Sequence, residues 1–311
     1  AVCCLSSLNI DTYDQWSEDP QFIEDVMRFL DNVMTDFINR APDEFAHAKY
    51  SAMRERSVGL GVMGLHSYFQ QKNIPFGSVM SKVWNKKIFK NIQEKVDLAS
   101  VSLAEERGAC PDAAEYGMKE RFSNKTAIAP TASISIICGG SSPGIEPIAA
   151  NSYTHKTLSG SFNVRNKYLK KILQKHKKDT DDVWSTITTN QGSVAHLDFL
   201  TPDEKDTFKT AFEIDQRWIV ELGADRTPHI SQAQSINIFI PADIHKKDLH
   251  DLHFQAWKKG LKSLYYCRSK SIQRAENVNK GSSTDVTKNV YSQGQESNNE
   301  SNNYEECLSC Q

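Results

Sequence analysis

The 311-residue sequence has no apolar run long enough to cross a membrane, and no charged segment followed by an apolar one that would act as a signal peptide. It also lacks an excess of either charge, since 37 basic residues stand against 39 acidic ones. A general polyanion-binding surface is therefore not expected. We predict no membrane segment and no nucleic-acid partner, in a chain long enough for one large domain or two small ones.

The cysteines do not form a regular framework. Their number is odd, their spacing is irregular, and two lie at the C-terminus; they are Cys3, Cys4, Cys110, Cys138, Cys267, Cys307 and Cys310. This pattern excludes a secreted disulfide scaffold and is typical of a reducing compartment, so a cytoplasmic location is expected. A zinc site would need a second pair of ligands near a cysteine pair, and the sequence offers none. We therefore predict no metal site.

A dinucleotide-binding loop is also excluded. Gly59, Gly61 and Gly64 match the Gly-x-Gly-x-x-Gly pattern, but the acidic residue and the βαβ context that a dinucleotide fold requires are missing. The glycines alternate with apolar residues, which indicates a tightly packed strand instead.

Helical and extended segments are interspersed along the chain, which predicts an α/β architecture. Residues 151–160 read as a polar connection, and from residue 269 onward the composition becomes polar, which predicts a disordered tail. We therefore expect one α/β domain over residues 1–268 and a flexible tail over 269–311. The expected helices are 19–38, 81–107, 167–178, 202–214, 218–222 and 243–259, and the expected strands are 1–10, 126–129, 235–240 and 261–267.

The stretch from Thr126 to Pro147 carries the strongest local signal. A short apolar strand stops at Pro130, which has no N–H to donate, and is followed by the hydroxyl residues Thr131, Ser133 and Ser135. A strand that breaks into a helix start leaves backbone N–H groups unpaired, and such groups bind anions such as phosphate. The same residue types also make ordinary turns and helix caps. Residue types alone leave both interpretations open.

The C-terminus ends in a Cys-x-x-Cys pair, Cys307 and Cys310. This spacing lowers the pKa of one thiol and closes a disulfide that exchanges easily. A dithiol on a tail of about 40 residues can travel far, which is what a redox shuttle needs.

Four motifs in order carry a resemblance to a known family. They are Ala-Val-Cys-Cys-Leu-Ser-Ser-Leu-Asn at the start, Pro-Thr-Ala-Ser-Ile-Ser with Gly-Ile-Glu-Pro, Leu-Tyr-Tyr at 264–266, and the terminal cysteine pair. Together they resemble the large, catalytic subunit of class I ribonucleoside-diphosphate reductase. The resemblance implies the second half of that family's ten-stranded α/β barrel, followed by a disordered tail.

The resemblance also implies roles for individual residues. Cys3 matches one of two cysteines that reduce the ribose 2′ carbon, and Tyr265 and Tyr266 match a pair that relays a radical from the small subunit. Cys307 and Cys310 match the pair that re-reduces the active-site disulfide. The substrate diphosphate would be held by Pro130, Thr131, Ala132, Ser133, Ile134 and Ser135. Ala132 departs from some members, which have an acidic residue at this position.

One family motif is missing. The thiyl-forming cysteine of the family lies in an Asn-x-Cys-x-Glu motif that does not occur here, and the chain begins at Ala1 rather than Met. We therefore expect the C-terminal portion of a split or truncated large subunit, inactive without an N-terminal fragment. The other implied partners are a small subunit with a di-metal tyrosyl radical, thioredoxin or glutaredoxin as reductant, and a ribonucleoside diphosphate substrate. No cofactor is expected on this chain.

Two other functions remain open. The chain could be a non-catalytic assembly subunit that keeps the fold, although retention of Cys3, the tyrosine pair and the terminal cysteines argues against this. It could also be a thiol–disulfide carrier that acts only through its tail.

Overall fold

The computed structural model describes residues 4–157 and 160–269. The predictions for Cys3, Cys307, Cys310 and the tail lie outside these residues. Across the described ranges, no helix is both long and apolar enough to cross a membrane.

Five parallel chain segments lie side by side and form the centre of the fold. β1 (Leu5–Asn9) pairs with β2 (Gly59–Met63), and parallel bridges join Leu60 to Thr126 and Ile128 to Gln234. β5 (Ile238–Ile240) then pairs with β6 (Cys267–Ser269). The α/β class is confirmed. In the described part of the chain this row stays open, and no closed barrel forms.

Several expected strands are shorter than predicted. Residues 126–128 make only two bridges, and β6 begins at Cys267, where the expected strand ends. Hydrogen bonds nevertheless continue the pairing before β6, since Tyr265 N donates to Ile236 O at 2.7 Å. The row is therefore longer than its regular strands.

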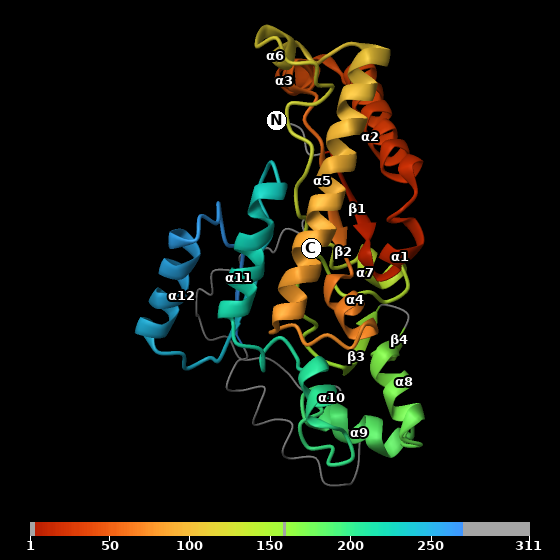
Figure 1. Ribbon diagram of the computed structural model, residues 1–311, viewed down its shortest axis with the longest axis vertical. Helices are drawn as coiled ribbons and strands as arrows, with labels where there is room; N and C mark the ends of the chain where they lie inside the picture. The colour runs from red at the N-terminus through yellow and green to blue at the C-terminus, as the bar shows by residue number, and fades with distance from the viewer. Residues whose placement is uncertain (1–3, 158–159, 270–311) are drawn as a thin grey trace, which may run out of the picture.

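Two long helices, α2 (Pro20–Arg40) and α5 (Val79–Arg107), run side by side along this row (Figure 1). The Asp19 side chain caps the start of α2, and a capping box of Ser78 and Ser81 opens α5. Both helices bury their periodic apolar faces in the main core. The expected helices 19–38 and 81–107 are confirmed, with ends shifted by at most two residues.

Short elements connect these parts. They are η1 (Ile10–Thr12), α1 (Tyr13–Trp16), η2 (Asp43–Phe45), α3 (Ala46–Glu55), α4 (Leu65–Gln71), α6 (Pro111–Glu115) and α7 (Ile134–Ile137). In Figure 1, α3 and α6 lie at the upper end of the long helix pair, and α4 and α7 lie nearer its lower half.

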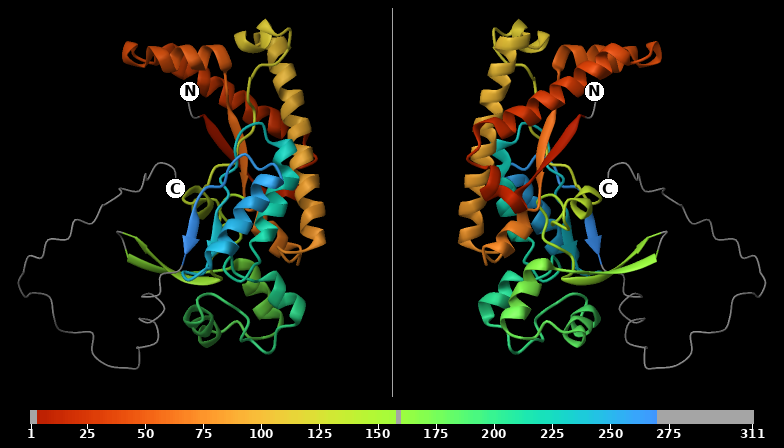
Figure 2. Two further views of the ribbon diagram at one scale, coloured as in Figure 1. Left: turned by 90° about the vertical axis from the view of Figure 1, so that its left-hand side faces the viewer. Right: turned by 90° about the vertical axis from the view of Figure 1, so that its right-hand side faces the viewer.

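The predicted polar connection over 151–160 is wrong. β3 (Ser152–Thr157) and β4 (Gly160–Arg165) form an antiparallel hairpin, which projects from the body in Figure 2. Tyr153 pairs with Val164 across it. The partner strand lies mostly beyond the segment whose composition indicated a loop, so local polarity could not reveal the pairing.

A second, smaller core lies under this hairpin. It gathers α8 (Lys167–Lys175), α9 (Asp181–Thr189) and α10 (Pro202–Thr207) around buried Trp184 and Phe208. The capping box of Thr201 and Glu204 forms as its sequence indicates, but α10 ends at Thr207 rather than near residue 214. The chain turns there because Ala211 N donates to Ile148 O at 2.7 Å.

The last helices cover the far end of the row. α11 (Arg217–Arg226) is followed by η3 (Thr227–His229) and α12 (Lys246–Lys258). The expected end of helix 218–222 at Gly223 is wrong, since α11 continues to Arg226. Gly223 lies where a Cβ atom would be 3.0 Å from Ile236 Cδ1, so it provides close helix–strand packing instead of a stop.

Candidate functional site

The loop after the central segment has an unusual backbone at its start. Thr131 has a φ of +55°, a left-handed conformation that β-branched residues rarely adopt. Its Oγ1 accepts a hydrogen bond from Gly144 N at 2.7 Å, and its carbonyl accepts one from Ser135 N at 3.1 Å. Thr131 thus holds both ends of the loop and α7 together.

Three successive N–H groups of this loop have no partner within the described residues: those of Ala132, Ser133 and Ile134. Ser133 is the N-cap residue of α7, but its side chain makes no capping hydrogen bond and is exposed. Ser135 Oγ instead donates to Ala132 O at 3.2 Å. Unpaired N–H groups at a helix start are suited to anion oxygens. The geometry therefore favours the anion-site interpretation over an ordinary cap.

The return of the loop is fixed to α4. Ser142 N donates to Ser67 Oγ at 2.8 Å, and Ser67 N donates to Ser142 Oγ at 3.1 Å. Gly64 N also donates to Ser142 O at 2.7 Å. This reciprocal pair ties the loop to the end of β2.

A buried carboxylate fixes the loop on the other side. Asp11, just after β1, accepts hydrogen bonds from Ser141 Oγ at 3.0 Å, from Tyr168 OH and from Lys167 Nζ. Burial, and then the hydrogen bond to Asp11, raise the pKa of Tyr168 well above its usual range. Sequence reasoning missed this cluster, although an aspartate directly after a strand was a possible signal.

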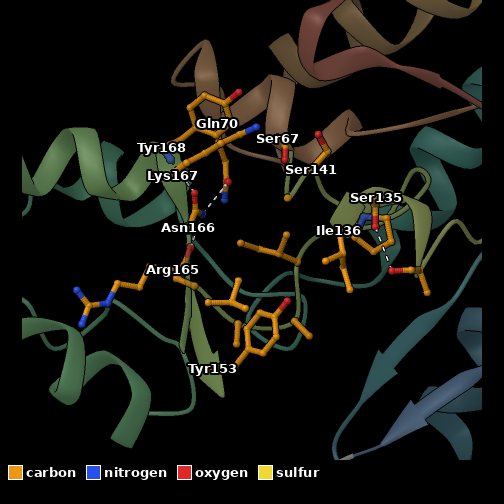
Figure 3. A pocket seen from close by; sticks show the side chains of 18 residues that line it. Ser67, Gln70, Ser135, Ile136, Ser141, Tyr153, Arg165, Asn166, Lys167 and Tyr168 are labelled. Carbon is orange, nitrogen blue, oxygen red and sulfur yellow. Dashed lines mark hydrogen bonds between the residues drawn. The ribbon is translucent and has the colours of Figure 1, made fainter. Parts of the chain in front are cut away.

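A cavity of about 380 Å³ lies against α7 (Figure 3). Ala132, Ser135 and Ile136 form one wall, while Ser133 and Ile134 do not line it. The remaining lining residues are Ser67, Gln70, Gly140, Ser141, Pro143, Ile148, Ala149, Ala150, Asn151, Tyr153, Val164, Arg165, Asn166, Lys167 and Tyr168. Gln70 Oε1 accepts from Asn166 Nδ2 at 2.9 Å, and Gln70 Nε2 has no partner in the described part of the chain. The loop thus has an enclosed side and an exposed side.

The two tyrosines lie in the pairing segment before β6. The rings of Tyr265 and Tyr266 have centroids 4.1 Å apart, and their exposed fractions are 37% and 47%. The Arg268 guanidinium lies 5.5 Å from the centroid of the Tyr266 ring. Two rings in contact provide adjacent oxidisable groups.

A buried carboxylate connects this segment to the loop. Asn237 Nδ2 donates to Glu146 Oε1 at 2.5 Å, and Asn237 Oδ1 accepts from Tyr266 N at 3.0 Å. Burial raises the pKa of Glu146 to about 7, although Arg268 and the Asn237 hydrogen bond act in the opposite direction. The Gly-Ile-Glu-Pro motif contains Glu146 but gave it no role. A polar Asn237 inside the apolar run 236–240 was the missed signal.

The described cysteines differ in exposure. Cys4 is buried with its Sγ 3.8 Å from Leu30 O, and Cys110 is buried too, whereas Cys138 and Cys267 are exposed. Leu5, next to Cys4, is 45% exposed, as expected for neighbours on opposite faces of a strand. Across residues 4–157 and 160–269, no three His, Cys, Asp or Glu side chains gather as a metal site would require.

The chain is similar to proteins of a known family. The family model described as "Ribonucleotide reductase, barrel domain" matches residues 1–119 and 111–267. The large subunit of ribonucleoside-diphosphate reductase from Invertebrate iridescent virus 6 is 49% identical over 282 residues, which is 89% of this chain and 29% of that protein. The corresponding subunit from Invertebrate iridescent virus 3 is 44% identical over 287 residues, covering 91% of this chain and 45% of that protein.

A solved structure agrees with these sequences. The class Id ribonucleotide reductase alpha subunit of Actinobacillus ureae matches with a TM-score of 0.81 and 39% identity, over 90% of this chain and 51% of that one. The chain thus spans about half or less of the length of these relatives. Since the family model covers most of its residues, the chain belongs to the ribonucleotide reductase barrel-domain family.

Proposed function

We propose that this chain supplies part of the catalytic centre of a class I ribonucleoside-diphosphate reductase. It would act together with an N-terminal fragment that carries the thiyl-forming cysteine and with a small subunit that carries a di-metal tyrosyl radical. The observation that carries the proposal is the loop at Pro130–Ser135, whose unpaired N–H groups follow a strand of the parallel row.

The loop is suited to the diphosphate of the substrate. The N–H groups of Ala132, Ser133 and Ile134 can each donate to phosphate oxygens, and such charge-assisted bonds are stronger than neutral ones. Ala132, in place of the acidic residue of some relatives, leaves no carboxylate to repel the phosphates. Pro130 and Ser135 frame the loop, and Thr131 fixes its conformation.

The five-segment row is consistent with half of a ten-stranded barrel. All its pairings are parallel, and within the described residues β1 pairs only with β2, so its other edge can accept further strands. An N-terminal fragment would supply these strands. It would also supply the cysteine that forms a disulfide with Cys3, and the thiyl-forming cysteine.

The proposed reaction begins with the radical on the partner and ends with a disulfide. A thiyl radical on the partner removes the 3′ hydrogen of the ribose, and the 2′ hydroxyl leaves as water. Cys3 and its partner cysteine supply two electrons and two protons and become a disulfide, while the 3′ hydrogen returns. Tyr265 and Tyr266 would relay the radical in and out. Cys307 and Cys310 would exchange with the disulfide, and thioredoxin or glutaredoxin would reduce them in turn.

The test is a reconstitution. The chain is mixed with the N-terminal fragment, the small subunit, CDP and a small dithiol, and dCDP is measured. We expect product only in the full mixture, and loss of product in Tyr265→Phe and Cys3→Ser. Tyr116→Phe is the matched control and should leave turnover unchanged, because Tyr116 is exposed and distant in sequence from the tyrosine pair.

The tail is tested in the same assay. Cys307→Ser with Cys310→Ser should abolish turnover with thioredoxin but retain it with the small dithiol, which can reach the active site directly. Loss with both reductants would favour a carrier role, and a stable complex without product would favour the assembly-subunit role.

A further inference from the structure

Hydrogen bonds and one short backbone segment join the proposed diphosphate loop to the tyrosine pair. Gly144 N donates to Thr131 Oγ1, the chain continues through Ile145 to Glu146, and the Asn237 side chain bonds both Glu146 and the backbone N–H of Tyr266. We infer that Glu146 and Asn237 are positioning residues that hold Tyr266 in register with the diphosphate loop. This inference rests on the proposed function and deepens it, since it assigns two residues to the geometry of radical transfer.

The loop end of the path is rigidly placed. Gly144 N donates to Thr131 Oγ1 at 2.7 Å, and Glu146 N donates to Pro143 O at 3.1 Å. Ile145 and Glu146 are both buried, with 2% and 7% of their surface exposed. The Glu146 carboxylate therefore moves only with the loop.

The strand end is equally constrained. Asn237 lies between Ile236, which is buried in the main core, and Ile238, which is buried in a smaller cluster with residues of α11 and α12. Backbone bonds flank it: Tyr265 N donates to Ile236 O at 2.7 Å, and Ile238 N donates to Tyr266 O at 2.9 Å. The Asn237 side chain extends this pairing, because its Oδ1 accepts a hydrogen bond from Tyr266 N. Tyr266 is the last residue before β6 begins.

The chemistry of the two partners fixes the amide orientation. The carboxylate of Glu146 can accept from an NH₂ group, and the N–H of Tyr266 needs an acceptor. A flipped amide would set two acceptors together at Glu146 and two donors together at Tyr266. Asn237 therefore has one satisfied orientation, and each partner supports the other.

A contact that only held the loop against the strand would not need a carboxylate and an amide. An apolar pair would fill the same space without the cost of burying a carboxylate and an amide. The buried polar pair instead specifies one geometry, because only one arrangement satisfies every donor and acceptor. That property is useful where the placement of an aromatic ring decides whether a radical can pass.

The direct test measures amide hydrogen exchange at Tyr266 in the full 311-residue chain. In Asn237→Ala and in Glu146→Ala we expect exchange at Tyr266 to accelerate by about tenfold or more, since the bond or its support is lost. In Glu146→Gln it should stay protected, because the glutamine oxygen still accepts from Asn237. The Tyr265 amide, bonded to Ile236 O, should stay protected in all three and shows that the chain remains folded.

Unchanged exchange at Tyr266 in Asn237→Ala would overturn the inference. If that variant does not fold, the comparison of Glu146→Ala with Glu146→Gln decides in its place. Equal protection in these two variants would also overturn it. Asn163→Ala, on the exposed hairpin, is the matched control.

The assembled reductase gives a second readout. Glu146→Ala should lower kcat by about tenfold or more with KM for CDP changed less than about twofold, and Glu146→Gln should restore most of the turnover. A raised KM with unchanged kcat would overturn the inference, since the pair would then serve substrate binding. Absence of product in the wild-type assembly would instead remove the proposed function, while the exchange experiment still decides whether the pair holds Tyr266.

Discussion

A Cβ atom on Gly61 would lie 2.2 Å from the carbonyl oxygen of Ala127. This close approach of two backbones allows β2 to pair with the segment that leads into the proposed diphosphate loop. The loop thus owes its position to a glycine on the neighbouring strand.

Gly61→Ala should therefore destabilise the fold by about 3 kcal/mol, because the clash is with backbone that cannot rotate away. The free energy of unfolding from urea denaturation measures this. Gly223→Ala is the matched control: its new methyl group would meet side-chain atoms of Ile236, Leu261 and Arg226 rather than backbone, and these can adjust. Equal losses in the two variants would contradict the role of the β2 contact.

Glu146 should make stability depend on pH. Its folded pKa of about 7 lies above the ordinary value of 4.5, so the folded state binds more protons between these values. Stability should fall as pH rises from about 4.5 to about 7 and then level off, by roughly 3 kcal/mol at about 1.4 kcal/mol per pKa unit. Denaturant unfolding across this pH range should show the decline in the wild type and a smaller one in Glu146→Gln. Parallel pH curves would contradict the burial of an ionisable Glu146.

Asp31 should stabilise the long helix pair. Its fully buried carboxylate accepts from Arg56 Nε at 2.9 Å, Arg107 Nη1 at 2.8 Å and Arg121 Nε at 2.8 Å. Asp31→Asn should cost roughly 3 kcal/mol, because three guanidinium groups would lose their shared anion. Asp36→Asn, at an exposed ion pair with Arg40, should have no measurable effect and is the control.

The same carboxylate should govern acid unfolding. Burial alone would raise the pKa of Asp31, but hydrogen bonds from Arg121 and Arg107 and the charge of Arg56 outweigh burial and lower it. The stability it contributes is thus present above the unfolded-state pKa near 4 and is lost as pH falls through the lower folded value. Acid titration followed by circular dichroism should show a shallower acid limb in Asp31→Asn.

The anion site can be tested at one N–H group. Ser133→Pro removes the N–H of residue 133, while the φ of −85° there is close to what proline allows. It should raise KM for CDP by about tenfold or more in the reconstituted enzyme, since a hydrogen bond to a charged group is lost. Ser133→Ala keeps the N–H and should bind CDP as the wild type does. A similar KM in both variants would exclude a backbone contact at Ser133.

Thiol reactivity should follow burial. In the native chain, Cys138 and Cys267 should be alkylated quickly, and Cys4 and Cys110 only after unfolding. Peptide mass spectrometry after a brief iodoacetamide pulse measures each site. Rapid labelling of Cys110 without denaturant would show that the loop before α6 opens.

Local sequence signals determined much of the architecture. The three- and four-residue spacing of apolar side chains predicted α2 and α5, because a helix that buries one face must repeat with its own period. The capping boxes at Ser78 and Thr201 and the break at Pro130 likewise act within a few residues of the chain. The motif order indicated the family, and the comparisons support that assignment.

Tertiary structure decided what depends on residues far apart. The hairpin β3–β4 escaped prediction because each strand is recognised by its partner rather than by its own composition. The early end of α10 depends on the hydrogen bond from Ala211 N to Ile148 O. The continuation of α11 beyond Gly223 depends on the packing of this glycine against Ile236.

The candidate site shows the same division between local and long-range signals. The sequence alone indicated the loop residues Thr131 and Ser133 and the adjacent tyrosines as candidates, since their motifs are contiguous. Only the fold brought Glu146 and Asn237, 91 residues apart, to within 2.5 Å of each other and set Asn237 against Tyr266. Such pairings are specified by the closing of long chain segments around a shared core, and no local pattern of residues encodes them.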